Sequence, residues 1–196
     1  MNPVVSENLI KLLEDALNNG IHVGIYSGFR SFNHQVNIWN SRLLGNKIIL
    51  DKLGLPINHA DYSQEEKIEL LYQWVSIPSM SRHHWGTDID IYESSFPITQ
   101  NFTLLPADFI NDGKFSKLYD WMKKHAFKYG FFMPYNNEPW HWSYKPLSDK
   151  FVAKLTVEMI IDSIKDSEVL GKDYIFKNID RLFNHAFVTH INSEYA

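Results

Sequence analysis

The sequence of 196 residues contains no cysteine. This excludes a disulfide framework, a cysteine nucleophile and thiolate ligands for a metal ion. Any metal site must therefore be built from histidine and carboxylate side chains. Because a domain without disulfides can fold on either side of a membrane, the lack of cysteine leaves the compartment open.

The sequence also has little excess charge and no long apolar run. Its formal net charge is −4, with both signs interspersed along the chain. Proteins that bind nucleic acid present a basic face, so nucleic acid is not expected as a partner. No stretch reaches the roughly 18 apolar residues of a membrane-spanning helix. The first residues lack the basic and apolar blocks of a secretory signal. A location in the cell envelope, in the periplasm or on the outer cell surface, is therefore expected only if an export signal was removed.

The composition and length are those of a protein with a substantial core. Hydrophobic residues make up 44% of the chain and aromatic residues 15%. A length of 196 residues suits one ordinary domain. We expect a single domain over residues 1–196, with a core over about 20–146. The pattern changes after Pro146, which predicts a helical appendage over 147–196.

The hydrophobic pattern predicts helices on both sides of a group of strands. Helical spacing predicts helices over 6–18, 32–44, 63–75 and 115–126, and two more over 148–165 and 174–191. Leu9, Leu12, Leu13 and Leu17 mark the apolar face of the first. Alternation predicts strands over 21–26, 88–92, 131–134 and 140–144. This order favours an α+β fold with a central antiparallel sheet, helices packed on it and a C-terminal helical extension.

Two segments of the predicted sheet carry the residue types of a catalytic zinc site. Residues 81–90 read SRHHWGTDID, and residues 138–141 read EPWH. Alternation lets neighbouring strands present Asp90 and His141 to one point, and His83 arrives from the loop before Gly86. Catalytic zinc sites use three nitrogen or oxygen ligands and keep a fourth position for water. The two segments therefore predict a zinc site on the sheet.

Spacing alone leaves two of these ligands open. His84 is adjacent to His83, although its side chain would point elsewhere in an extended segment. Asp88 lies on the same strand face as Asp90 and is an equal candidate.

Glu138 is a candidate for proton transfer rather than for metal binding. It lies three residues before His141, but Pro139 makes a helical arrangement of the two unfavourable. We therefore expect Glu138 at the entrance of the strand, as a base that accepts a proton from an attacking water and passes it to a leaving amine.

The order of these motifs resembles that of the VanY-like zinc D-alanyl-D-alanine carboxypeptidases, peptidase family M15, which are related to the N-terminal domain of Hedgehog and to lysostaphin-type enzymes. The resemblance rests on the Ser-x-His-x-x-Gly-x-x-x-Asp pattern of residues 81–90 and the Glu-x-Trp-His pattern of residues 138–141. The segment SGFRS at 27–31, with Gln35, and the segment YGF at 129–131 also match family elements. The resemblance therefore extends over about residues 20–145.

This resemblance implies a peptidase that hydrolyses peptidoglycan stem peptides, with a D-alanyl-D-alanine carboxypeptidase as the favoured activity. One zinc ion per chain would be held by His83, Asp90 and His141. Glu138 would act as general base and acid, and Arg30 would bind the scissile carbonyl or its oxyanion. The residues that would hold a peptide ending in D-Ala-D-Ala are Ser81, Gln35, Arg30 and Trp140.

The chain departs from the family pattern at two positions. Ser79 stands where many members have glycine, and Asp88 stands where a small alanine is common. The family also contains L,D-carboxypeptidases and peptidoglycan endopeptidases, which are the alternative activities. Hedgehog-like relatives keep zinc but act as binding modules, so a non-catalytic cell-wall binding module is an alternative of another class. Glu138 and Arg30 argue against it, because a pure binding module needs no proton shuttle.

Overall fold

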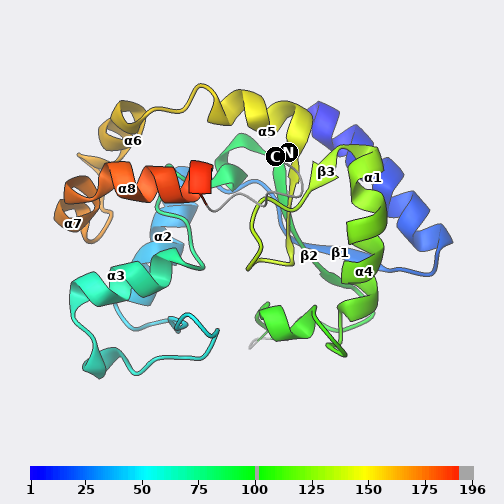
Figure 1. Cartoon of the computed structure of the whole chain (residues 1–196), viewed down its shortest axis with the longest axis horizontal. Coiled ribbons are helices and arrows are strands. Elements are labelled where there is room, and N and C mark those ends of the chain that lie inside the picture. The colour runs from blue at the N-terminus through cyan, green and yellow to red at the C-terminus, as the bar shows by residue number, and fades with distance from the viewer. Residues whose placement is uncertain (100–101, 190–196) are drawn as a thin grey trace. The chain divides into compact units, whose positions relative to one another are not determined.

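The computed structural model describes residues 1–99 and 102–189, and these residues form two compact units. One unit consists of Met1–Phe29 and Trp85–Ala153, and the other of Arg30–His84 and the described residues from Lys154 onward. The first unit contains the β-sheet, and the second is mainly helical (Figure 1). That the chain is a single domain stays a prediction.

The first unit begins with the helix α1 (Pro3–Asn18), which confirms the helix predicted over 6–18. It starts earlier because the Asn2 side chain caps it, accepting a hydrogen bond from the Val4 N–H at 3.1 Å. Pro3 at its first position needs no hydrogen-bond partner. The buried face consists of Val5, Leu9, Leu12 and Ala16. Leu17 is 58% exposed, so the prediction that it belongs to the buried apolar face is wrong.

The sheet of the first unit has four antiparallel strands in the order β1-β2-β4-β3. Their bounds are β1 (Val23–Ser27), β2 (Asp88–Glu93), β3 (Phe131–Phe132) and β4 (His141–Tyr144). Each predicted strand is present, although β3 is shorter than the predicted 131–134. The two central strands, β2 and β4, are the two that carry the predicted zinc motifs.

The chain reaches β3 through a helix and a tight glycine turn. The helix α4 (Ser116–His125) continues as the 3-10 helix η4 (Ala126–Tyr129), as predicted from the apolar residues over 115–126. Gly130 then ends it in the left-handed region, with φ of 83°. A Cβ at this position would lie 2.7 Å from the ring of Tyr144, so the turn needs glycine for both space and conformation. The short 3-10 helix η3 (Pro106–Asp108) precedes α4.

The second unit contains the predicted helices over 32–44 and 63–75. They are α2 (Phe32–Leu43) and α3 (Gln64–Tyr72). Ser31 caps the first by accepting from the His34 N–H. Ser63 and Glu66 form the predicted capping box of the second, with both reciprocal hydrogen bonds present. The segment between the two helices holds only the short 3-10 helix η1 (His59–Asp61) and an isolated bridge between Leu50 and Pro56.

The predicted C-terminal helical extension is present, but the prediction that it consists of two long helices is wrong. The segment 148–165 forms two helices, α5 (Lys145–Val152) and α6 (Val157–Ile164). They separate because the Thr156 side chain accepts a hydrogen bond from the Met159 N–H and starts a new helix. The second predicted helix is likewise divided at Asn178, into α7 (Lys172–Lys177) and α8 (Ile179–Asn184), followed by a π-helical turn over His185–Thr189. Its predicted end at 190–191 lies outside the described residues.

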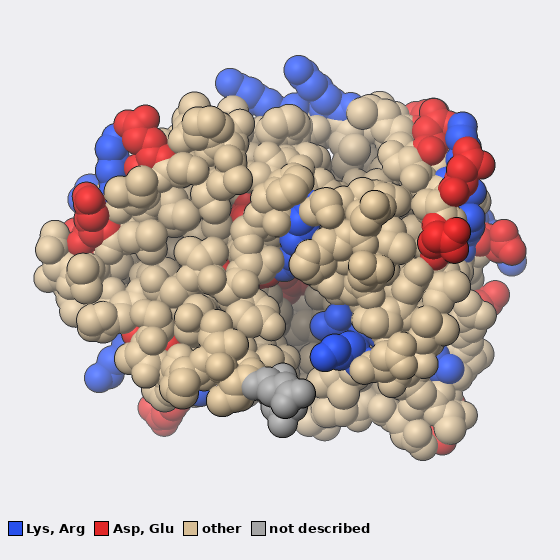
Figure 2. Space-filling model, turned by 180° about the vertical axis from the view of Figure 1, so that it is seen from behind, with Lys and Arg blue, Asp and Glu red and all other residues tan. Residues whose placement is uncertain are grey.

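The predicted α+β class with a central antiparallel sheet is thus confirmed. Among the described residues, no helix combines the length and the apolar character required to cross a membrane. On the face shown in Figure 2, side chains of both charges are present, in keeping with the mixed charge of the sequence.

Candidate metal centre

The pairing of β2 with β4 brings the predicted motif residues onto one face of the sheet. Asp90 lies opposite His141, and Asp88 lies opposite Ser143. Ile89 lies opposite Trp142, and because side chains alternate along a strand, this pair belongs to the other face. The expectation that neighbouring strands present Asp90 and His141 together is confirmed.

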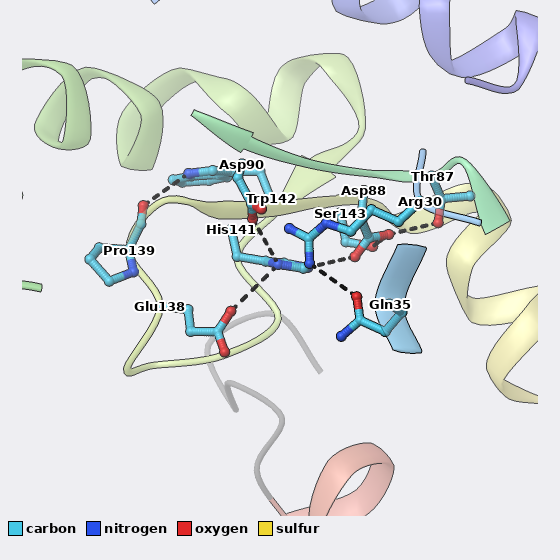
Figure 3. A network of polar contacts seen from close by, with 10 residues as sticks. All are labelled: Arg30, Gln35, Thr87, Asp88, Asp90, Glu138, Pro139, His141, Trp142 and Ser143. Carbon is cyan, nitrogen blue, oxygen red and sulfur yellow. Dashed lines mark hydrogen bonds and ion pairs between the residues drawn. The ribbon is translucent and has the colours of Figure 1, made fainter. Parts of the chain in front are cut away.

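His141 is surrounded by three carboxylates (Figure 3). Its Nδ1 lies 3.2 Å from Asp90 Oδ1 and 3.5 Å from Glu138 Oε2, and its Nε2 lies 2.7 Å from Asp88 Oδ2. Burial lowers the pKa of His141, but the hydrogen bonds with Asp88 and Asp90 outweigh burial and raise the pKa to about 10. The buried carboxylates therefore strongly favour a positive charge at this point of the sheet.

His83 lies on the 3-10 helix η2 (Arg82–Trp85), which leads into β2 through Gly86. Gly86 has a φ of 67°, which permits the sharp turn between the helix and the strand. The His83 side chain is buried, as are those of Asp90 and His141. One candidate ligand atom from each of the three lies within 4.8 Å of the others.

This group fits a zinc ion by the chemistry of its donors. Two imidazoles and one carboxylate are a common set of three protein ligands in catalytic zinc sites. The cluster also favours positive charge, as the raised pKa of His141 shows. His83, Asp90 and His141 could therefore hold a metal ion. Their role as zinc ligands stays a prediction.

His84, the alternative to His83, has a different role in the structure. Its Nε2 accepts a hydrogen bond from the Ser79 N–H at 3.2 Å. The ring proton is then on Nδ1, which lies 2.7 Å from the Arg30 carbonyl oxygen. Burial lowers the pKa of His84, although the hydrogen bond to Arg30 opposes this effect. Both ring nitrogens of His84 contact backbone atoms, so His84 has a structural role and is not a candidate metal ligand.

Asp88, the alternative to Asp90, contacts the other side of the His141 ring. Its side chain is completely buried. Oδ1 accepts hydrogen bonds from Thr87 Oγ1 at 2.6 Å and from Ser143 Oγ at 2.8 Å. The sequence did not identify Thr87 and Ser143 as functional residues. Alternation along the two strands predicts that Asp88, His141 and Ser143 lie on one face of the sheet. It does not predict the strand register, which is what pairs Asp88 with Ser143.

Glu138 lies just before β4, as expected from Pro139. Its carbonyl oxygen accepts a hydrogen bond from the His141 N–H at 2.9 Å, which forms a tight turn into the strand. This turn directs the Glu138 carboxylate back to His141 (Figure 3). The side chain is 16% exposed, so it is in contact with solvent and able to exchange a proton.

Arg30 is held by side-chain and backbone contacts. Its Nη1 lies 3.5 Å from Gln35 Oε1, and Gln35 Nε2 donates to the Ser76 carbonyl oxygen at 2.7 Å. The Arg30 N–H also donates to the His83 carbonyl oxygen at 3.2 Å. Gln35 is fully buried on α2, so its side chain supports the guanidinium of Arg30 directly.

The remaining two predicted substrate residues are buried. Ser81 is 1% exposed, and its carbonyl oxygen accepts a hydrogen bond from the His84 N–H in the first turn of η2. Trp140 is 8% exposed and packs against Phe109 with a ring separation of 6.0 Å. Its carbonyl oxygen accepts from the Ile91 N–H at 2.9 Å, which places it at the junction of β4 with β2. Their contact with a peptide stays a prediction.

Two relatives match the chain in sequence. An uncharacterized protein of Haemophilus influenzae is 29% identical over 124 residues, which cover 58% of this chain and 95% of that protein. A D-alanyl-D-alanine carboxypeptidase of Enterococcus faecalis is 22% identical over 150 residues, which cover 71% of this chain. The matched part is 46% of that enzyme, so the chain spans about half the length of this second relative.

The solved structures that share the fold include two VanY proteins. A mutant of the vancomycin resistance D,D-pentapeptidase VanY in complex with Zn(II) has a TM-score of 0.55 at 21% identity, covering 77% of each chain. VanYB in complex with D-alanine-D-alanine has a TM-score of 0.55 at 20% identity, covering 84% of this chain and 83% of that one. The family model for VanY, D-alanyl-D-alanine carboxypeptidase, matches residues 1–147. Since this match includes η2, β2 and β4 and most of the sequence, the chain belongs to the VanY family of D-alanyl-D-alanine carboxypeptidases.

Proposed function

We propose that the protein is a zinc-dependent peptidase of the cell envelope that releases the terminal D-alanine from peptidoglycan stem peptides. The observation that carries this proposal is the group of candidate ligand atoms on His83, Asp90 and His141, all within 4.8 Å of one another. Glu138 adds a carboxylate 3.5 Å from His141 Nδ1. Three nitrogen or oxygen ligands beside an acid–base group are the parts of a hydrolytic zinc centre.

One zinc ion per chain would supply Lewis acidity, polarising the scissile carbonyl and making water more acidic. Glu138 accepts the proton of the attacking water on its carboxylate and donates it to the nitrogen of the departing D-amino acid. The position of Glu138 supports this role, because its carboxylate is directed to His141 and keeps some contact with solvent. Asp90 and His83 are buried, which limits competing water around the ligand atoms.

Arg30 binds the scissile carbonyl oxygen and stabilises the negative charge that develops on it. A planar guanidinium is always charged and presents several N–H donors in fixed directions. Its contact with Gln35 supports this assignment, because it restricts the guanidinium before substrate arrives, while the hydrogen bond from the Arg30 N–H to the His83 carbonyl oxygen holds the backbone at Arg30. Gln35 acts on the peptide through Arg30, while Ser81 and Trp140 form the wall against which the peptide lies.

A peptide ending in D-Ala-D-Ala is the favoured substrate. A family model described as D-alanyl-D-alanine carboxypeptidase and the fold shared with VanYB in complex with D-alanine-D-alanine support this choice. Stem peptides of this kind occur in the cell wall, so we propose that the protein acts in the cell envelope.

The test is mass spectrometry of peptides before and after incubation with the zinc-loaded protein. A muramyl pentapeptide should lose one D-alanine. Glu138→Gln is the matched variant, because it keeps the size of the side chain and removes its basicity. We expect the rate to fall by about 10²- to 10⁴-fold in this variant, the usual contribution of a general acid–base group.

Three other outcomes would change the proposal. Cleavage of the tetrapeptide alone would assign an L,D-carboxypeptidase, and cleavage of intact cross-linked sacculi would assign an endopeptidase. If the zinc-loaded protein cleaves none of these substrates but still binds them, the chain is a binding module and the enzymatic proposal is wrong.

A further inference from the structure

Asp88 is a buried carboxylate that touches a candidate zinc ligand without belonging to the candidate ligand group. It is completely buried, and its Oδ2 lies 2.7 Å from His141 Nε2. The candidate group consists of His83, Asp90 and His141. A buried carboxylate that lacks hydrogen bonds and a positive partner destabilises the folded protein. The groups that contact Asp88 therefore indicate its role.

The neighbours of Asp88 fix the direction of its two oxygens. Thr87 Oγ1 and Ser143 Oγ both donate to Oδ1, at 2.6 and 2.8 Å. Both hydroxyl residues are completely buried, so these hydrogen bonds are shielded from water. With Oδ1 engaged by two donors, Oδ2 is directed at the His141 ring (Figure 3).

This arrangement distinguishes the two nitrogens of His141. An ionised carboxylate only accepts hydrogen bonds, so the nitrogen that faces Asp88 Oδ2 must carry a proton. That nitrogen is Nε2. The opposite nitrogen, Nδ1, lies beside Asp90 Oδ1 at 3.2 Å and Glu138 Oε2 at 3.5 Å. Nδ1 is therefore the atom that can offer a lone pair to a metal ion.

We propose that Asp88 is a positioning residue that keeps the proton of His141 on Nε2 and thereby presents Nδ1 to zinc. Metal-binding histidines commonly donate their second ring N–H to a carboxylate, which fixes the ring and makes the ligating nitrogen more basic. Thr87 and Ser143 are the residues that orient this carboxylate. Asp88 can act in this way only if zinc binds as proposed above.

The test measures zinc affinity rather than catalysis. Zinc dissociation constants of the full chain are determined by competition with a chromophoric chelator. Asp88→Asn has almost the same shape but lacks the negative charge, and we expect it to bind zinc about 10- to 100-fold more weakly. Ser143→Ala, which removes one of the two donors to Oδ1, should weaken binding less. Ser148→Ala is the control, because it also replaces a fully buried serine of the same unit and should leave the affinity unchanged.

A second measurement needs no variant. In long-range ¹H–¹⁵N spectra of the zinc-loaded protein, His141 should show a proton on Nε2 that exchanges slowly with water, and Nδ1 should carry no proton. Zinc on Nε2, or an Asp88→Asn variant that binds zinc as tightly as the original protein, would overturn the role of Asp88.

The outcomes also separate Asp88 from the proposed peptidase activity. Weaker zinc binding in Asp88→Asn, together with no cleavage of any peptide by the original protein, would support the role of Asp88 and contradict the peptidase. If the original protein binds no zinc at all, the metal site and the role of Asp88 are both wrong.

Discussion

The Ser79 N–H donates a hydrogen bond to His84 Nε2, and it does so from a left-handed backbone conformation with φ of 72°. Few residues other than glycine adopt such a conformation, because the Cβ crowds the backbone. The second ring nitrogen of His84 contacts the Arg30 carbonyl oxygen. The strained turn at Ser79 therefore supports the hydrogen bonds by which His84 connects the segment 81–90 to Arg30. Glycine adopts this conformation without strain, which is a physical reason for the glycine that the family resemblance implies at this place.

Replacing Ser79 with glycine should stabilise the protein. A left-handed conformation costs a residue with a Cβ about 1–2 kcal/mol, and part of this gain is offset by the greater freedom of glycine in the unfolded chain. We expect Ser79→Gly to raise the free energy of unfolding by about 0.5–1 kcal/mol in urea titrations. Ser79→Ala is the control, since it removes the hydroxyl and keeps the backbone strain. Equal stability of the two variants would show that the backbone conformation is not the cause.

Replacing Arg30 with lysine should reduce turnover more than substrate binding. Lysine keeps the positive charge but loses the fixed, forked arrangement of donors. Loss of a donor to a developing oxyanion typically lowers kcat by about 10²- to 10³-fold. Steady-state kinetics on the pentapeptide give kcat and KM separately, and Arg42→Lys is a matched control on α2. A rise in KM with unchanged kcat would instead indicate that Arg30 binds the terminal carboxylate of the substrate.

Zinc should stabilise the folded chain, and this effect should depend on Asp90. A ligand that binds only the native state adds about 2.7 kcal/mol when its concentration is 100 times the dissociation constant. Thermal unfolding with zinc and with a chelator should therefore give a higher Tm with zinc. Asp90→Asn should abolish most of the difference, whereas Asp61→Asn, at an exposed position, should preserve it. A zinc-induced shift of the same size in Asp90→Asn would contradict the predicted ligand group.

The stability of the second unit should depend on the ionisation of Glu69. Burial raises the pKa of Glu69, but hydrogen bonds from Arg181 and Tyr174 outweigh it and lower the pKa below its usual value. A lowered folded-state pKa stabilises the protein above the ordinary pKa of the group, and this contribution disappears as the pH falls through the folded-state pKa. We expect Glu69→Gln to destabilise the protein at pH 7, with the difference shrinking as the pH falls below about 4.

Urea titrations at several pH values test the role of Glu69. Glu65→Gln is the matched control, because Glu65 is exposed on the same helix, α3. If the difference between Glu69→Gln and the original protein were the same at pH 7 and at pH 3, ionisation of Glu69 would not be responsible.

Local sequence patterns were sufficient for most elements of the fold. Alternation identified the faces of β2, and the capping box at Ser63 and Glu66 marked the start of α3. The break between α5 and α6 was missed because the apolar pattern continues through it. A single cap at Thr156 competes with helix continuation there, and propensity over a long window does not reveal such a competition.

The candidate site was predictable in its residue types but not in its hydrogen bonds. The motif order selected His83 and Asp90 over His84 and Asp88, and the structure gives both alternatives other contacts. These contacts depend on strand register and on a turn with positive φ. Both are tertiary features, which one-dimensional spacing does not contain.

The pairing of β2 with β4 has a consequence for how this protein can vary in length. Asp88, Asp90, His141 and Ser143 share one face of two neighbouring strands because their register is fixed at Asp90 and His141. One residue inserted into either strand would turn its polar side chains to the opposite face and bring Ile89 or Trp142 into their place. We therefore expect insertions and deletions among related chains to spare these two strands and to accumulate in the loop over residues 45–62, where an added residue displaces no ligand atom.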